Sequence, residues 1–369
     1  MKTILLLPVF RFGNSLNAIT IRTIEIYSRI NKKDFNFIIN LDKNTYNSID
    51  NYYYNKIKDM DKSFGYAGKN VIKLLKGIIS TWKNARKSEY IIGESEYFYS
   101  VLYSYFIHVL SRRPLIIIVH HVHPDMYKKN SYVHYAIYKH IFCKVKKILI
   151  SENEPIIKEF QKNFSRNYRN KMNLLKITYA VDTNSFYTSD EKKYDLLYIG
   201  TIEERKNALL LPDIVQKLKK NKQDIKLLII SHRGEIDKLK DIINRKGLVK
   251  NVDIISYVTE EEKRRYLAIS KIFVFPTKYE GFGMVIAEAL ASYLPVALFD
   301  VPTLRIFSKG VLKAKPFDFN EYINNIAFLL KNNDEIKKLG IEGRKDVEER
   351  FDYNAVSQRE NNIIKEATF

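Results

Sequence analysis

The sequence predicts an α/β protein in which two parallel β-sheets are each covered by helices on both faces. Three observations predict this class: the length of 369 residues, a series of short apolar runs bounded by polar turns, and helical patterns between the runs. The runs are continuously apolar rather than alternating, which is typical of strands buried on both faces of a parallel sheet. Two successive series of runs predict two Rossmann-like domains, and this length suits two domains.

Each series is expected to form one sheet with crossover helices. The first series of strands is expected at residues 2–8, 35–41, 115–120, 147–151 and 174–179. The second series is expected at residues 195–200, 225–231, 252–256, 272–276 and 295–299. Helical patterns occupy residues 16–30, 71–87, 208–219, the segment from Met284 onward, and 353–367.

A polar, strand-poor stretch at residues 182–193 separates the two series of strands. It predicts a first domain at residues 1–182 and a second domain at 183–352. A final helix is expected at residues 353–369.

Composition excludes several classes of protein. The single cysteine, Cys143, excludes a disulfide framework and a cysteine-rich zinc module, and fits a reducing compartment such as the cytoplasm. The longest uncharged apolar run, Tyr97–Leu110, is shorter than the roughly 18 residues that a spanning helix needs. The apolar start at Ile4–Leu7 is interrupted by Arg11 and has no cleavage site after it, so we expect a buried strand there rather than a signal peptide.

Positive charge is concentrated in the first half of the chain. The formal net charge is +20, and residues 1–190 carry 30 basic and 15 acidic side chains against 32 and 27 in the remainder. This asymmetry points to an anionic partner for the first half: a membrane surface, a phosphorylated lipid, an acidic glycan or nucleic acid. The alternative is that these side chains form a solvent-exposed basic face that binds no partner.

The segment Phe273–Ala291 is the most informative in the chain. It predicts a strand that stops at Pro276, a loop with Gly281 and Gly283, and then a helix. Such a loop lies at the carboxyl edge of a parallel sheet, where open α/β sheets bind their ligands. Its glycines allow the free amides at the helix start to approach an anion such as a diphosphate.

Charged side chains frame this loop. Glu280 precedes the helix and Glu288 lies inside it, and each carboxylate can accept both hydroxyls of a vicinal diol. Arg205 and Lys206 follow the first strand of the same domain, where they could hold phosphates. Taken one at a time, groups of these kinds are more often ordinary surface charge.

Together, the segments Gly200–Asn207 and Phe275–Ala291 resemble the retaining GT-B glycosyltransferases of family 4, also called glycosyl transferases group 1. The resemblance covers the second half of the chain. It implies two Rossmann-like domains facing across a cleft, with the last helix crossing back to the first domain. It also implies transfer of a sugar, with retention of configuration, from a UDP- or GDP-sugar to a glycan, lipid-linked or protein acceptor, with no metal or other cofactor.

The resemblance also implies roles for individual residues. Glu280 would bind hydroxyls of the donor sugar and Glu288 the nucleotide ribose, while Lys206 and the amides of Gly283 and Met284 would bind the diphosphate. The remaining donor contacts would be Arg205, Val258, Gly281, Phe282, Val285 and, in the first domain, Gly13. His120 would stand near the donor sugar and the acceptor as a catalytic group.

The chain departs from the family pattern at several positions. Thr201 stands where Arg is common, and Tyr293 stands where Gly usually precedes the next strand. His120, His121 and His123 lie close together, which is also consistent with a metal site, but no cluster with ligand spacing accompanies them. We therefore expect no metal.

A helix at residues 71–87 is predicted to be amphipathic, with a basic side and Trp82 on its apolar side. Such a helix can lie in a lipid headgroup layer, so Lys73, Lys76, Trp82, Lys83 and Lys87 are candidate contacts to a membrane or an acceptor. The protein would then be cytoplasmic and peripheral to the membrane. Packing of this helix on its own sheet is the alternative.

Two rival functions remain at this point. A GT-B nucleotide-sugar epimerase or phosphorylase would share the fold but would not transfer sugar to an acceptor. A basic nucleic-acid-binding protein would explain the charge, but it leaves the Glu280 and Glu288 loop without a role.

Overall fold

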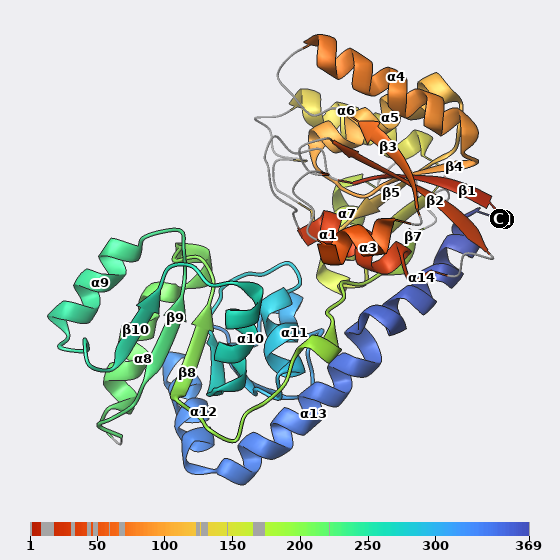
Figure 1. Cartoon of the computed structure of the whole chain (residues 1–369). Coiled ribbons are helices and arrows are strands. Elements are labelled where there is room, and N and C mark those ends of the chain that lie inside the picture. Colours follow the sequence, from red (N-terminus) through yellow and green to blue (C-terminus); the bar gives the residue numbers. More distant parts are fainter. Residues whose placement is uncertain are drawn as a thin grey trace. The chain divides into compact units, whose positions relative to one another are not determined.

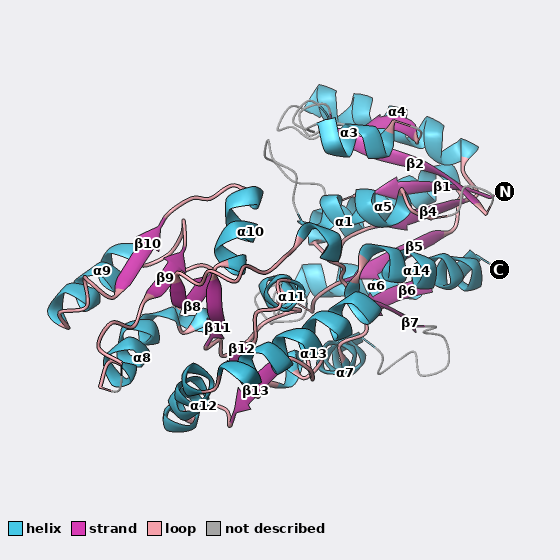
Figure 2. Cartoon of the chain, turned by 60° about the horizontal axis from the view of Figure 1, so that its bottom comes forward, coloured by secondary structure: helices cyan, strands magenta, loops and turns pink. Residues whose placement is uncertain are grey.

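The structure is a computed structural model that describes residues 2–8, 18–30, 34–42, 46, 51–58, 60–65, 71–122, 126, 132–145, 147–164, 174–220 and 222–368. The chain divides into two compact units. The first unit combines residues 1–180 with 353–369, and the second unit contains residues 181–352. Each unit has one parallel sheet with helices on both faces (Figures 1 and 2), which confirms the predicted fold class.

In the described part of the first unit, the sheet has seven strands in the order β3-β2-β1-β4-β5-β6-β7. Its strands are β1 (Lys2–Leu7), β2 (Phe35–Asp42), β3 (Asp61–Gly65), β4 (Tyr90–Gly93), β5 (Leu115–Val119), β6 (Lys147–Ser151) and β7 (Leu174–Ile177). The central strands are fully buried, as continuous apolar runs require. β3 and β4 were not predicted, because β3 is largely polar and lies at the sheet edge, while β4 has only four residues.

Helices cover both faces of this sheet. One face carries α4 (Val71–Lys87), α5 (Phe98–Ser111), α6 (Tyr132–Lys144) and α7 (Glu154–Phe164), which share a core with β1, β4, β5 and β6. The other face carries α1 (Ala18–Tyr27), α3 (Asn51–Ile57) and α14 (Tyr353–Thr368).

The C-terminal helix α14 is part of the first unit, as the fold prediction required. It packs on α1, where the buried side chains of Arg22 and Glu360 form an ion pair. Arg22 also donates to the carbonyl oxygen of Thr178 at 2.8 Å. The end of the chain is therefore fixed to the N-terminal sheet by a buried charge pair as well as by apolar contacts.

The sheet of the second unit has six strands in the order β10-β9-β8-β11-β12-β13. Its strands are β8 (Tyr194–Ile199), β9 (Leu227–Ile230), β10 (Val252–Ile255), β11 (Ser270–Phe275), β12 (Val296–Phe299) and β13 (Val311–Ala314). Its helices are α8 (Leu211–Leu218), α9 (Ile236–Arg245), α10 (Glu260–Ala268), α11 (Met284–Ala291), α12 (Phe319–Lys331) and α13 (Asn333–Phe351). The predicted helix at 208–219 begins as a 3₁₀ turn, and β13 was missed because it is a short edge strand containing Lys313.

Tyr293 shows why glycine is common at its position. Its φ is +58°, a left-handed conformation that costs a non-glycine residue roughly 1–2 kcal/mol. The guanidinium of Arg344 lies over its ring at 5.3 Å, a contact that glycine could not make. The departure from the family pattern thus keeps the backbone shape and adds a side-chain contact.

Candidate functional site

The candidate site forms where two neighbouring strands of the second unit end. β8 and β11 are adjacent, so the loops after them meet at the carboxyl edge of the sheet. Backbone contacts fix these loops to each other, since the amide of Lys278 donates to the carbonyl oxygen of Arg205 at 2.9 Å. The buried hydroxyl of Thr277 also donates to the carbonyl oxygen of Arg205 at 3.2 Å.

The paired loops bring the first predicted carboxylate against the predicted cations. The side chain of Glu280 forms an ion pair with Lys206, and both side chains are largely buried. Nη1 of Arg205 lies 3.5 Å from the same carboxylate. The ammonium of Lys206 also lies over the ring of Phe275, 4.7 Å from its centroid. Residues 74 positions apart in the sequence thus form one charged cluster.

Gly283 begins helix α11 in a conformation that other residues adopt at a cost. Its φ is +89°, and a Cβ added there would lie 2.9 Å from Cδ1 of Ile286. The amides of Met284 and Val285 belong to the first turn of the helix, where no carbonyl group of the helix can accept from them. The start of α11 is therefore suited to an anion.

Phe282 and Gly281 contribute to this loop differently from the charged residues. The ring of Phe282 is buried against Phe307 and Phe351, with ring centroids 5.3 and 5.2 Å apart. Any contact of Phe282 with a ligand would therefore be made by its backbone. Gly281 is buried, and its amide donates to Oε1 of Glu280 at 3.3 Å.

The second predicted carboxylate has a partner that was not predicted. Oε1 of Glu288 lies 2.9 Å from the ammonium of Lys263 in α10, which also pairs with Glu260 at 2.8 Å. Burial raises the pKa of the Glu288 carboxyl, and the charge of Lys263 opposes that rise. Burial also disfavours the charged form of Lys263, but the two carboxylates outweigh it and raise the pKa of this lysine.

The free oxygen of Glu288 is the feature most suggestive of a ligand. Its Oε2 is buried and makes no hydrogen bond with any residue that the structure describes. An unpaired buried carboxylate oxygen is costly unless a donor such as a hydroxyl group reaches it.

Val258 lies in the loop between β10 and α10 and is half-buried, next to the exposed ring of Tyr257. The loop ends at Thr259, which caps α10: its hydroxyl accepts from the amide of Glu262 at 3.1 Å. The cap fixes the first turn of α10 and so helps to position Lys263.

His120 follows β5 in the first unit and is almost completely buried. Burial lowers its pKa to about 3, so the imidazole is neutral at physiological pH. Its amide donates to Glu96 at 3.1 Å, and its Nε2 bonds no residue in the described ranges. Glu94 and Glu96, buried at the end of β4, were missed because that strand was missed.

Some predicted features are not placed by the structure. Gly13 and His123 lie outside the described residues, and only the backbone of Lys73 is described. Among the residues that are described, no group of three or more His, Cys, Asp or Glu side chains could hold a metal ion.

The candidate membrane contacts lie on α4. Lys76, Lys83 and Lys87 are exposed, whereas Trp82 is half-buried and its Nε1 donates to the carbonyl oxygen of Leu110 in α5 at 3.0 Å. The apolar side of α4 thus packs at least partly on its own unit. Within the part of the chain that the structure covers, no helix is long and apolar enough to cross a membrane.

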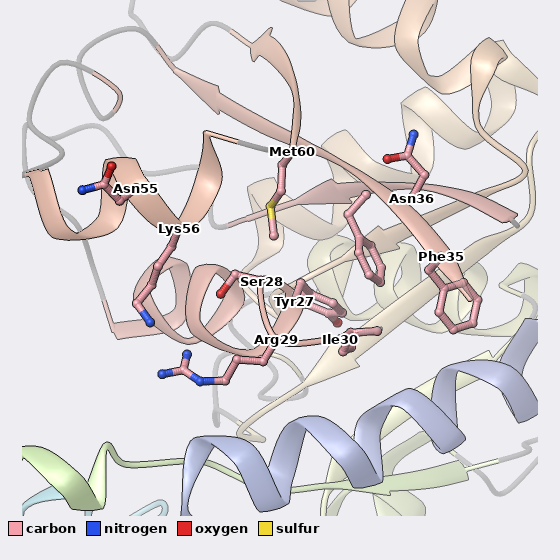
Figure 3. A pocket seen from close by; sticks show the side chains of 10 residues that line it. Tyr27, Ser28, Arg29, Ile30, Phe35, Asn36, Asn55, Lys56 and Met60 are labelled. Carbon is pink, nitrogen blue, oxygen red and sulfur yellow. The ribbon is translucent and has the colours of Figure 1, made fainter. Parts of the chain in front are cut away.

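A separate pocket of about 390 Å³ opens in the first unit (Figure 3). Its wall includes Tyr27, Phe35 and Met60, and the cations Arg29 and Lys56 stand at its rim. Both cations pair with the buried carboxylate of Glu25. The pocket lies where β2 begins, so it is not at the carboxyl edge of the sheet, and its charges are already matched.

The two parallel sheets and the returning C-terminal helix define a GT-B fold. The structure is similar to HepE of Anabaena in complex with UDP and glucose, with a TM-score of 0.76 and 12% identity over 99% of this chain and 100% of that one. It is also similar to sucrose-phosphate synthase from Thermosynechococcus elongatus, with a TM-score of 0.75 and 16% identity over 99% of both chains.

Sequence comparison relates the second unit to one family. Residues 183–346 match glycosyl transferases group 1. The chain is 34% identical over 140 residues to the O-antigen chain mannosyltransferase B of Escherichia coli, which covers 37% of each chain. It is 26% identical to the poly(ribitol-phosphate) alpha-N-acetylglucosaminyltransferase of Staphylococcus aureus over 45% of this chain and 34% of the relative. The matches thus span about a third of these curated relatives. The family match assigns residues 183–346, most of the second unit, to glycosyl transferases group 1.

Proposed function

We propose that the protein transfers a sugar from a nucleotide-sugar donor to an acceptor with retention of configuration, and that the donor binds to the second unit. The observation that carries this proposal is a pair of largely buried carboxylates, each paired with a lysine. Glu280 lies in the loop before α11, and Glu288 lies within that helix. Glu280 would bind hydroxyls of the sugar, and the free Oε2 of Glu288 would accept from the ribose. Val258 would lie against the base.

The diphosphate would lie between these carboxylates. Lys206, Arg205 and the first amides of α11 supply positive charge for the oxygens of the leaving group, so that transfer needs no metal ion. In the free protein Lys206 is paired with Glu280. We infer that the arriving diphosphate shares this lysine, which leaves the Glu280 carboxylate available to the sugar hydroxyls.

The acceptor would bind to the first unit. The curated relatives act on polymers according to their names, an O-antigen chain and poly(ribitol-phosphate), which favours a glycan acceptor here. The excess of basic residues in positions 1–190 favours an acceptor linked to lipid and a protein that docks on the cytoplasmic face of an anionic membrane. His120, neutral because it is buried, would contact the sugar or acceptor as a hydrogen-bonding group rather than as a cation.

A panel of UDP- and GDP-sugars, each tested for thermal stabilisation of the protein, tests the donor assignment. A ligand present at 100 times its Kd stabilises the folded state by about 2.7 kcal/mol, so one member of the panel should raise the Tm clearly. The Glu288→Gln variant should keep the Tm of the free protein and bind that donor about 10- to 100-fold more weakly, because ribose hydroxyls lose a charged acceptor. A donor that stabilises both proteins equally would contradict the ribose assignment.

Lys263 is expected to control the pH dependence of donor binding. Because Lys263 opposes the raised pKa of Glu288, replacing it by methionine should raise that pKa further. As the pH is lowered, Glu288 of the variant should therefore become protonated at a higher pH than Glu288 of the wild type. Its carboxyl group then no longer accepts two hydroxyls. Glu260 and Arg264 also act on this carboxyl, but both remain in the variant.

Calorimetry at pH 6 and pH 8 measures this effect. The ratio of the donor Kd at pH 6 to that at pH 8 should be larger for Lys263→Met than for the wild type. Lys246→Met is the control, since Lys246 pairs with Asp213 at 2.9 Å away from the donor loop. Equal ratios in all three proteins would show that Lys263 does not hold Glu288 in its charged form.

A further inference from the structure

Helix α5 buries an unusually polar face for a helix that packs on a sheet. Among its buried residues are three serines, Ser100, Ser104 and Ser111. Ser104 stands against Gly93, where an added Cβ would lie 2.7 Å from its hydroxyl oxygen. The other two buried residues are Val101 and Ile107, so the inner face of α5 is mixed where a uniform apolar stripe is usual.

The outward face of α5 is apolar. Its exposed large side chains, between 38% and 65% accessible, are Tyr99, Leu102, Phe106, Val109 and Leu110. At 3.6 residues per turn these five positions fall within an arc of about 100°. We call this arc the α5 ridge. Isolated exposed apolar residues are common, but a contiguous row of them marks an interaction surface.

The neighbouring helix α4 carries the matching charge. Five exposed positions of α4 have the same spacing as the five residues of the α5 ridge. They are Lys76, Ile79, Lys83, Arg86 and Lys87, so four of the five are basic. α4 packs directly on α5, and both cover the same face of the sheet (Figure 1). The helices α4, α5 and α6 together contain seven Lys or Arg residues and no Asp or Glu.

We propose that the α5 ridge inserts into the interface of an anionic lipid leaflet, while the cations of α4 contact the headgroups. A helix with an apolar outer face beside a basic one suits the boundary between acyl chains and headgroups. The 14 residues of α5 span about 21 Å, less than the roughly 30 Å of a bilayer core, so the helix lies in the interface rather than across it.

This inference deepens the membrane docking proposed above, and it does not depend on sugar transfer. It differs from the sequence-based prediction, which assigned the lipid-facing apolar side to α4 itself. In the structure Ile78 and Ala85 of α4 pack in the core, and Trp82 bonds to α5. Charge selects the partner: two copies meeting at this face would bring the basic rows of both close together, whereas an anionic leaflet complements them.

The test is sedimentation with vesicles of phosphatidylglycerol and phosphatidylcholine at low salt, in the absence of any sugar donor. Phe106→Gln combined with Val109→Gln should reduce the partition coefficient about tenfold or more. The matched control is Phe328→Gln combined with Ile341→Gln in the second unit, whose side chains are similarly exposed, at 49% and 61% against 46% and 53%. The control should bind like the wild type.

Any other outcome would contradict the proposal that the α5 ridge inserts into a lipid leaflet. Wild-type protein that ignores anionic vesicles, or a ridge variant that binds them normally, would show that the ridge does not meet lipid. A wild-type dimer that the ridge variant dissociates, without any vesicle binding, would assign the ridge to a second copy of the chain. Thermal stabilisation by the donor should be unchanged in the ridge variant, so a failure of the donor assignment would be recognised separately.

Discussion

Replacing Glu280 by glutamine should lower kcat about a hundredfold while changing the donor Kd less than tenfold. The amide keeps the shape of the carboxylate but loses its charge, so the loss should be largest where the contact strengthens, in the transition state. Lys206 would also lose a largely buried counter-charge next to the proposed diphosphate position. The measurement is kcat with a saturating donor, together with the donor Kd from calorimetry.

Glu203→Gln is the matched control for this experiment. Its carboxylate pairs with the same Arg205, at 2.7 Å, but lies in a more exposed position. It should change kcat less than a few fold, since exposed ion pairs contribute little. Equal losses in both variants, or a loss confined to donor affinity in Glu280→Gln, would remove Glu280 from the catalytic role.

Replacing Glu360 by glutamine should lower the free energy of unfolding of the first unit by about 3 kcal/mol. The variant leaves the guanidinium of Arg22 buried without its counter-charge, and breaking one half of a buried pair is strongly destabilising. Urea denaturation followed by fluorescence suits the measurement, because the only tryptophan, Trp82, belongs to the first unit.

Two further variants separate the buried pair from the rest of α14. Lys365 lies on the same helix and pairs with Asp34 at 2.7 Å in a more exposed position, so Lys365→Gln should lower the stability clearly less than Glu360→Gln does. Arg22→Met combined with Glu360→Leu should recover most of the stability lost in Glu360→Gln, because no charge is left buried. A Glu360→Gln protein as stable as Lys365→Gln would mean that the C-terminal helix is held by apolar contacts alone.

The sequence was sufficient for the fold because long, fully buried parallel strands leave a continuous apolar signal. β5 and β11 are of this kind, and both were predicted close to their observed positions. β3, β4 and β13 left no such signal, since short or edge strands bury too few side chains to be distinguished from loops. The exposed apolar face of α5 was not predicted for a related reason: without the sheet, nothing indicates which face of this largely apolar helix lies inside.

The candidate site was predictable where backbone conformation dictates the residue. Gly283 has to be glycine because of its positive φ, and the strand, loop and helix around it set the place of Glu280. The role of Lys263 was not predictable, because this residue lies in the charged run Glu260–Arg265, which is typical of a solvated helix surface. Only the approach of α10 to α11 makes it the partner of Glu288.

Sugar transfer itself is the most direct test. The protein should be incubated, without added metal, with the donor that stabilises it, a glycan acceptor and a trace of lipid-linked acceptor, and the products examined by NMR. We expect release of the nucleoside diphosphate and a new glycosidic bond with the anomeric configuration of the donor, and both should be lost in Glu280→Gln. Conversion of the donor without a glycosylated product would instead indicate an epimerase or phosphorylase. Salt-sensitive binding of nucleic acid with no reaction of any nucleotide sugar would contradict the assignment of the site altogether.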